Sequence, residues 1–286
     1  KKVRLPLVGR EIPVIADTYV DRDFGSGALK ITPGHDFNDY EIGKRHNLAT
    51  ISVFDKTGKV NSLGGKYAGL TIAEAREAVV VDLTESGELV KVESHSNNVG
   101  VCDRCERFLE PMVSEQWFMN VKPMAEKAIE AVRKAESLSL EEVEAREDCI
   151  KLVPSTWLAT YYHWMENIQD WCISRQLWWG HQIPAWYCDD CKSITVVREN
   201  PSECKQCKSK KITQDEDVLD TWFSSGLWPF STLGWPEKTL AYKTFYPSNI
   251  LETGFDILFF WVARMIMMGM HFNDGKVPFK RVYLHA

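Results

Sequence analysis

The sequence lacks an excess of positive charge. Its 34 lysine and arginine residues are outnumbered by 40 aspartate and glutamate residues, so the net charge is −6. This excludes a global basic field that would attract nucleic acid, and any contact with RNA must come from local patches. Internal repeats and low-complexity tracts are also absent, which argues against repeat architectures and disorder. With 44% hydrophobic and 12% aromatic residues over 286 positions, the chain is long enough for two core-forming domains.

A long apolar run without charges is missing as well. The most apolar stretch, residues 255–272, contains Asp256 and Arg264 and is at the short end of what spans a bilayer. We therefore expect a buried core helix and no membrane partner. The chain starts at Lys1 without an initiator methionine or an apolar signal segment, so we expect an excised piece of a longer, cytoplasmic protein.

Four of the eight cysteines have the spacing of a zinc ribbon. Two residues separate Cys188 from Cys191 and Cys204 from Cys207, and twelve residues lie between the pairs. Two such knuckles bring four thiolates around one tetrahedral zinc ion. The polar residues between them cannot build an apolar core, so zinc is expected to organise residues 186–209. A disulfide framework is the alternative, but nothing in the sequence points to export.

A third knuckle, Cys102 and Cys105, has no second pair nearby once the ribbon has taken its four ligands. Two interpretations are open. The pair is half of a second metal site whose other ligands lie outside this sequence, or it is two buried thiols. Cys149 and Cys172 stand alone beside apolar neighbours, which is typical of small buried side chains.

Residues 1–97 have the pattern of a small α+β module. A helix is predicted after Thr71, which forms a capping box with Glu74, and Gly87 provides its stop. Short β-type runs separated by Gly and Asp turns precede the helix, at residues 3–7, 12–16 and 28–32.

The pattern changes after residue 97. Residues 98–155 are expected to form a connector with the lone knuckle, a strand-like piece at Trp117 and Phe118, and a helix opened by Pro123. Residues 156–286 are rich in Trp and Tyr and end in a strand, a glycine turn and the apolar helix. That order is half of a nucleotide-binding α/β unit, so the expected fold class is α/β.

A cluster of polar residues marks the first module: Lys30, Thr32, Asp36 and Asp39. Lys30 and Thr32 are two apart on the expected strand and so face the same side. If Asp36 caps the next helix, Asp39 lies in its first turn, where an ionised carboxylate is favoured and can hold an ammonium group. The alternative is that these residues have structural roles only. Asp36 would be a helix cap, Asp39 would interact with the helix dipole, and Lys30 would be a solvated strand residue. His35 is expected to be a turn residue and not a metal ligand.

The run GALKITPGHDFNDYEIGKRH, residues 27–46, is similar to the editing-domain signature of valyl-tRNA synthetases. The resemblance implies part of an α+β and β-barrel domain that hydrolyses threonine mistakenly esterified to the valine tRNA. Asp39 would hold the α-ammonium group, and Lys30, Thr32 and Asp36 the threonine hydroxyl and the tRNA end. Valyl-tRNA synthetases are a standard example of a pocket that rejects a hydroxylated isostere only weakly, so editing is needed. The family's threonine-rich editing strand is absent, and the pocket is expected to be incomplete.

Two aromatic-rich blocks would by themselves indicate core packing: WCISRQLWWGHQIPAWYC at residues 171–188 and DVLDTWFSSGLWPF at residues 217–230. Both resemble blocks of class I synthetases for branched aliphatic amino acids, in the form of the valine enzyme. The resemblance implies the second half of a Rossmann-type catalytic domain that includes the zinc ribbon. Trp179 and Trp222 would be the walls of the valine pocket.

The resemblance also assigns the turn that follows the last predicted strand. Glu252 would lie near the aminoacyl-adenylate, Gly254 would let the adenosine approach the backbone, and Asp256 would accept hydrogen bonds from the ribose. It implies a monomeric ligase that uses ATP with magnesium to join valine to its tRNA. The family's HIGH and KMSKS motifs do not occur in this sequence, so no catalytic set is complete and the isolated chain is expected to make no adenylate.

Three alternatives stay open. A freestanding deacylase that clears mischarged tRNA would not need the long activation half. A zinc-ribbon RNA-binding module without catalysis fits poorly with the acidic balance. An isoleucyl- or leucyl-type synthetase is the close relative to exclude, and the two aromatic-rich blocks argue against it.

Overall fold

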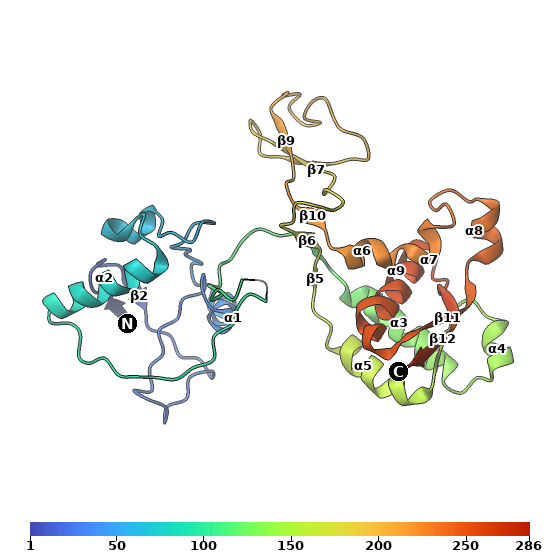
Figure 1. The fold of residues 1–286 in the computed structure, drawn as a ribbon, viewed down its shortest axis with the longest axis horizontal. Coiled ribbons are helices and arrows are strands. Elements are labelled where there is room, and N and C mark those ends of the chain that lie inside the picture. Colours follow the sequence, from blue (N-terminus) through green and yellow to red (C-terminus); the bar gives the residue numbers. More distant parts are fainter. Residues whose placement is uncertain (104) are drawn as a thin grey trace. The chain divides into compact units, whose positions relative to one another are not determined.

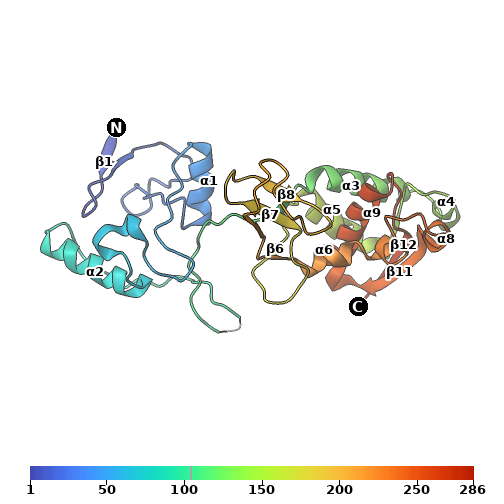
Figure 2. The ribbon, with the colours of Figure 1, turned by 90° about the horizontal axis from the view of Figure 1, so that it is seen from above.

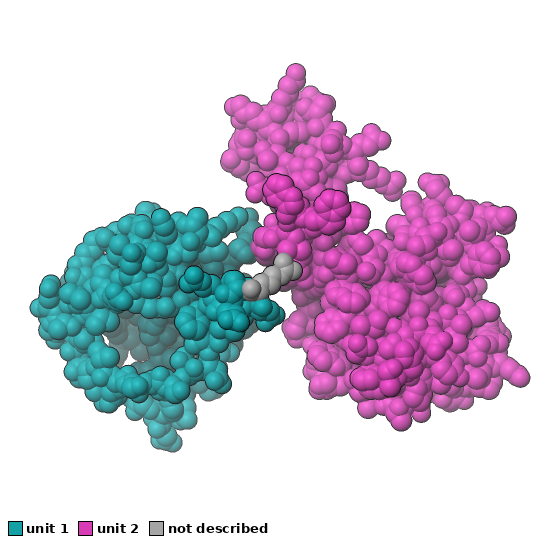
Figure 3. Space-filling model, viewed as in Figure 1, with its two compact units in different colours: residues 1–115 teal, residues 116–286 magenta. Residues whose placement is uncertain are grey.

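The chain divides between Glu115 and Gln116 into two units, which Figure 3 colours separately. A computed structural model describes residues 1–103 and 105–286. From the sequence we predicted a connector over residues 98–155. In the structure, residues 98–115 belong to the first unit and residues 116–155 to the second.

The first unit combines two helices with long irregular segments (Figures 1 and 2). Its strands β1 and β2 pair in antiparallel fashion, and the strands described here do not close a barrel. Its small apolar cluster joins Val60, Tyr67 and Ala75. The elements are β1 (Lys2–Arg4), β2 (Glu11–Pro13), α1 (Phe37–Arg45), the 3-10 helix η1 (Ser62–Tyr67) and α2 (Ile72–Glu85).

Helix α2 begins and ends where the sequence predicted. The Glu74 amide donates to Thr71 Oγ1 at 3.3 Å, and the Thr71 amide donates to the Glu74 carboxylate at 2.8 Å. The capping box is therefore confirmed. After the last turn Gly87 has φ +71°, a left-handed conformation that glycine adopts without strain.

The strand predicted at residues 28–32 is not formed. A β-strand needs a neighbour for its amide and carbonyl groups, and no strand that the structure describes pairs with this segment. The Thr32 amide donates to the Asp39 carboxylate instead, at 2.6 Å. The prediction was wrong because an alternation of apolar and polar residues shows only which side chains share a face. It does not show whether a partner strand exists.

The second unit contains an α/β core and a small antiparallel ribbon (Figures 1 and 2). Its helices are α3 (Lys122–Ala135), α4 (Leu140–Glu144), α5 (Leu158–Glu166), α6 (Thr221–Gly226), α7 (Trp228–Ser231), α8 (Leu240–Phe245) and α9 (Arg264–Phe272), with the 3-10 helices η2 (Ser155–Trp157) and η3 (Phe255–Ile257) and the π-helix η4 (Leu258–Ala263). Its strands are β3 (Phe118–Met119), β4 (Lys151–Val153), β5 (Trp171–Cys172), β6 (Ser174–Arg175), β7 (Ala185–Cys188), β8 (Ile194–Val196), β9 (Ile212–Gln214), β10 (Val218–Leu219), β11 (Ser248–Gly254) and β12 (Phe279–His285).

A parallel sheet forms the centre of this unit. Its strand order is β11–β12–β4, with Ser248 opposite Phe279 at one end of the β11–β12 pair and Gly254 opposite His285 at the other. Strand β11, the helices that follow it and β12 make a β–α–β connection, which confirms the predicted α/β class. Pro123 lies at the start of α3, as predicted.

The core of the second unit is continuous. Helix α9 contacts α3, α6 and α7, and α3 also contacts α5. The segment 255–272 is long and apolar enough to cross a membrane by length and composition, but half of it is buried within the unit, as expected of a core helix. The most deeply buried side chains include Ala128, Tyr161, Phe230, Met265, Ile266, Phe279 and Val282.

The ribbon is an excursion between β6 and β10, which pair with each other at its root (Figure 1). Within it, β7 is the central strand and pairs with β8 and β9 in antiparallel fashion. Trp117 Nε1 and the Tyr187 hydroxyl both donate to Asp215 Oδ2 at 2.7 Å, so a buried carboxylate ties the ribbon to the first residues of the unit.

Candidate functional site

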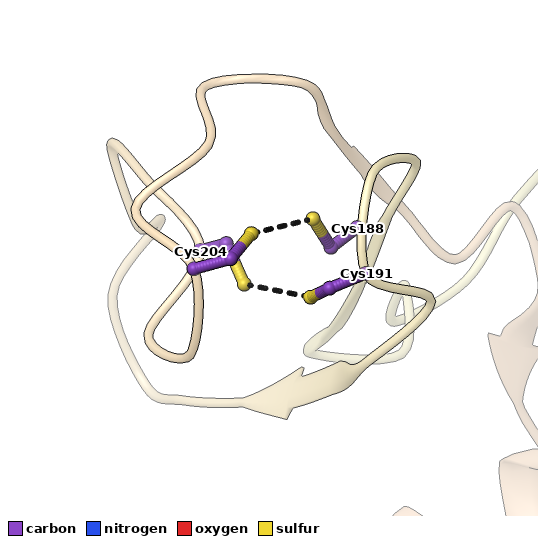
Figure 4. Close-up of side chains that lie close together, drawn as sticks. Cys188, Cys191 and Cys204 are labelled. Atoms are coloured by element: carbon purple, nitrogen blue, oxygen red, sulfur yellow. Dashed lines mark hydrogen bonds between the residues drawn. The ribbon is translucent and has the colours of Figure 1, made fainter.

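The four ribbon cysteines lie together. Their Sγ atoms are all within 4.8 Å of one another, and those of Cys191 and Cys204 are 3.6 Å apart. The Sγ atoms of Cys188 and Cys207 are separated by 3.5 Å. Figure 4 shows Cys188, Cys191 and Cys204 gathered on facing parts of the ribbon. In a tetrahedral site with Zn–S bonds of about 2.3 Å, the sulfur atoms are about 3.8 Å apart. The four side chains therefore match the size and donor chemistry of a zinc–thiolate site.

A metal requires thiolates, and local hydrogen bonds favour that form at Cys191 and Cys204, whereas hydrogen bonds with the neighbouring thiols raise the pKa of Cys207 to about 12. Ser193 Oγ lies 3.1 Å from Cys191 Sγ and 3.3 Å from Cys204 Sγ. This contact lowers the pKa of Cys191 below the usual thiol value and, with amides of the second knuckle, lowers the pKa of Cys204 to about 6.

The backbone hydrogen bonds around Cys102 match those around the ribbon knuckles. The Cys102 amide donates to the Arg107 carbonyl at 2.9 Å, and the Glu106 amide donates to the Cys102 carbonyl at 2.8 Å with Glu106 at φ 55°. In the ribbon, the Lys192 amide donates to the Cys188 carbonyl at 2.9 Å, with Lys192 at φ 59°. Cys105 is exposed and Cys102 half-buried, which does not match the interpretation as two buried thiols.

The polar cluster of the first unit is assembled around the start of α1. Asp36 is the N-cap, and its carboxylate accepts the amides of Asn38 at 2.8 Å and Asp39 at 3.0 Å. Lys30 Nζ donates to Thr32 Oγ1 at 2.6 Å, so these two side chains do face the same side. Asp39 is 7% exposed and accepts the Thr32 amide. Asp39 thus joins the helix start to the Lys30–Thr32 segment.

His35 is a structural residue in this loop. The Val53 amide donates to His35 Nε2 at 2.9 Å, so the proton of the neutral ring is on Nδ1 and is donated to the Pro111 carbonyl at 3.0 Å. The ring also lies 4.5 Å from that of Phe54. Both nitrogens are used by backbone groups, which agrees with the prediction that His35 is no metal ligand.

The two expected pocket walls lie in different settings. Trp222 is the second residue of α6, packs against the main core and stacks on Phe260, with ring centroids 6.2 Å apart. Trp179 is 88% exposed on the loop between β6 and β7, and its neighbour Trp178 is fully exposed. The structure therefore gives Trp222 aromatic neighbours and leaves Trp179 in solvent.

Glu252, Gly254 and Asp256 lie at the carboxyl end of β11 and in the turn after it. Glu252 and Asp256 are exposed. A Cβ added at Gly254 would come within 2.5 Å of Asp256 Oδ1, so the absence of a side chain lets this carboxylate lie against the strand end. A hollow of about 100 Å³ borders the same turn, lined by Asp256, Phe255, Trp164, Tyr161, Phe259 and Phe260 among others.

Sequence reasoning missed a cluster around Trp171. Its indole Nε1 donates to Asp220 Oδ2, Arg175 bonds the same carboxylate oxygen, and the guanidinium of Arg264 stacks on its ring. The residues come from three segments far apart in the sequence. In the sequence, Trp171 and Arg264 are notable only because each lies among apolar residues. That pattern does not show that the two side chains contact each other or that Trp171 bonds Asp220.

Comparison with known proteins identifies the family of the chain. The model of the class I tRNA synthetases, the group for isoleucine, leucine, methionine and valine, matches residues 30–286. The chain therefore belongs to the class I tRNA synthetase family.

Its relatives narrow the class further. Over all 286 residues the chain is 56% identical to the valine–tRNA ligase of Syntrophotalea carbinolica and 55% identical to that of Clostridium tetani. It covers 30% and 31% of these proteins, so it spans about a third of the length of the relatives it matches. Among solved structures, the methionyl-tRNA synthetase of Mycobacterium tuberculosis aligns with 65% of this chain and 29% of its own, at 15% identity and a TM-score of 0.36.

Proposed function

We propose that this chain is an internal part of a valine–tRNA ligase, which uses ATP with magnesium to attach valine to its tRNA. The supporting observation is the identity of 55–56% with relatives of that name, which continues through the whole chain. The parallel β11–β12 pair agrees with it, because ligands of such folds bind beyond the carboxyl ends of the strands. Glu252, Gly254 and Asp256 lie at that end of β11 and are proposed to face the adenylate.

The test is valine-dependent exchange between ATP and pyrophosphate by the full-length product of this gene. Exchange with valine, and much weaker exchange with isoleucine or leucine, is expected. The isolated 286-residue chain is expected to give none, because it carries neither the HIGH nor the KMSKS motif. A preference for isoleucine would indicate an isoleucyl-tRNA synthetase. Exchange by the isolated chain would contradict the proposal that part of the active site lies outside it.

We further propose that Lys30, Thr32, Asp36 and Asp39 form one wall of a pocket that hydrolyses threonyl-tRNA. The buried Asp39 carboxylate accepts one backbone amide through Oδ2, and its charge is suited to the α-ammonium group of a mischarged amino acid. The resemblance of residues 27–46 to the editing-domain signature supports this role, and we propose that residues outside this chain complete the pocket.

Asp39→Asn in the full-length protein tests the role of the Asp39 charge apart from the hydrogen bond that Asp39 accepts from Thr32. The amide side chain keeps an oxygen that can accept the Thr32 amide, so folding is preserved while the ammonium partner is lost. Hydrolysis of threonyl-tRNA is expected to fall at least about tenfold, the order of one charge-assisted contact. The control is Glu41→Gln on the same helix, whose exposed carboxylate pairs with Lys44 at 3.1 Å. Equal loss in both variants would contradict the assignment.

For the metal sites, we propose that Cys188, Cys191, Cys204 and Cys207 hold one zinc ion that organises the ribbon. Cys102 and Cys105 are proposed as half of a second site, with the remaining ligands contributed from outside this chain. The size of the thiol cluster supports the first proposal. The hydrogen bonds around Cys102, which match those of the ribbon knuckles, support the second.

A further inference from the structure

Trp171 is held on two sides within the second unit. Its indole Nε1 donates to Asp220 Oδ2 at 3.1 Å, and the guanidinium carbon of Arg264 lies 3.8 Å from the centre of its ring. Trp171 is 8% exposed and Asp220 5% exposed, so the bond between the indole and the carboxylate is shielded from water, while Arg264 is half-buried. One buried ring on β5 therefore connects the segment before α6 with the first residue of α9.

Asp220 determines where α6 begins. Its Oδ1 accepts the Trp222 amide at 2.9 Å, which makes it the N-cap of the helix. Its own amide donates to the Ile173 carbonyl at 2.8 Å, and Arg175 Nη2 bonds its second oxygen. The carboxylate is thus attached to the β5–β6 segment on one side and to the Trp222 backbone on the other.

Arg264 extends the same connection to the segment after β11. It follows directly on the π-helix η4, which carries Phe260. Phe260 stacks on Trp222 with an angle of 27° between the rings. The two aromatic residues therefore come from elements that are both anchored at Trp171, one through the edge of the indole and the other through its face.

We propose that Trp171 and Asp220 are positioning residues that fix the Trp222–Phe260 pair and so set the width of the amino-acid pocket. This rests on the proposed function, because Trp222 is a pocket wall only if the chain is part of a valine–tRNA ligase. Neither residue is assigned a contact with the reacting atoms. Loss of either anchor lets α6 shift relative to η4 and weakens the fit to valine. ATP is proposed to bind at Glu252–Asp256, which these bonds do not hold.

The experiment uses the full-length gene product with Asp220→Asn and Trp171→Phe. The first variant is nearly isosteric, and the second keeps an aromatic face for Arg264 while removing the indole donor. In each, KM for valine is expected to rise about tenfold, the order of one hydrogen bond to a charged group, while KM for ATP stays unchanged. The double variant is expected to resemble Asp220→Asn, because that variant already weakens the indole bond that Trp171→Phe removes, together with the bond from Arg175.

A matched control pair exists at the root of the ribbon. Trp117 Nε1 donates to Asp215 Oδ2 at 2.7 Å, and Asp215 is 9% exposed, so the chemistry and the burial of the carboxylate resemble those of the Trp171–Asp220 pair, while Trp117 is half-buried. Asp215→Asn and Trp117→Phe are expected to lower the melting temperature without changing KM for valine.

The outcomes separate this proposal from the proposed function. Equal changes of KM for valine in both pairs, or a rise in KM for ATP as large as that for valine, would overturn the positioning role. If the unsubstituted protein shows no valine-dependent exchange, the proposed function fails and the positioning role with it. If Asp220→Asn does not fold, as judged by circular dichroism, Trp171→Phe alone decides between these outcomes.

Discussion

The two units are stabilised in different ways. In the second, apolar side chains from the helices and the parallel sheet form one large core. Among the described residues of the first, a small buried cluster joins Val60, Tyr67 and Ala75 with a few partly buried neighbours. Its loops are held by polar side chains bonded to distant backbone, such as His35 to residues 53 and 111. The first unit therefore depends on individual hydrogen bonds, and the second on the summed burial of apolar surface.

The ribbon is the exception within the second unit, because its order is proposed to depend on zinc. Chelation, or Cys204→Ser, is expected to unfold residues 185–214 and leave the α/β core folded. The effect is the largest predicted here, since zinc binding to such sites contributes about 10–16 kcal/mol. Metal analysis and hydrogen exchange would measure it. Cys102→Ser should leave the single zinc of the isolated chain in place, and a chain purified without chelator that holds none would contradict the assignment.

The next largest effect on stability is expected in the core of the second unit. Phe230 is fully buried and makes edge contacts with Trp235 and Tyr246. Phe230→Ala is expected to lower the free energy of unfolding by about 3–5 kcal/mol, because a cavity is left in a packed core. The matched control is Phe24→Ala in the first unit, whose ring is 77% exposed. Urea denaturation should show a change within about 0.5 kcal/mol for it, and a comparable loss in both would remove the contrast.

A polar substitution tests the first unit. His35→Phe keeps the ring packing against Phe54 but leaves the Val53 amide and the Pro111 carbonyl without their partner. We expect a loss of about 1 kcal/mol in the stability of this unit, the order of one hydrogen bond to partly buried backbone. Protease resistance of residues 1–115 would report it, with the exposed His95→Ala as control. Unchanged resistance would show that hydrogen bonds are not what holds the loops.

Acid should affect the first unit through Asp17. Hydrogen bonds from the Arg45 guanidinium, the Tyr19 amide and His46 hold the pKa of this carboxyl well below its usual range. A depressed pKa gives stability above the unfolded value of about 3.9 that is lost as the pH falls toward the folded value. The stability of the unsubstituted chain should therefore fall more steeply below about pH 4 than that of Asp17→Asn. Parallel curves, measured by acid titration of circular dichroism, would contradict this.

Much of the local structure was predictable. The capping box at Thr71, the start of α3 at Pro123 and the strand–turn–helix order around Gly254 depend on residues that are close in sequence, and the structure confirms them. The same is true of the convergence of the four ribbon cysteines. The polar cluster at Asp36 was partly predictable, because its cap is local, while the bond from Thr32 to Asp39 replaces the strand that alternation had suggested.

The sequence by itself determined the family, the metal-type knuckles and the helix ends, because each depends on residue types at short fixed spacings. Only the tertiary structure decided that residues 116–155 belong to the second unit, that Trp179 lies in solvent while Trp222 packs on Phe260, and that Trp171 joins Asp220 to Arg264. These outcomes depend on partners distant in the chain. A buried polar group must find such a partner to offset its desolvation, and no local pattern shows which one it finds.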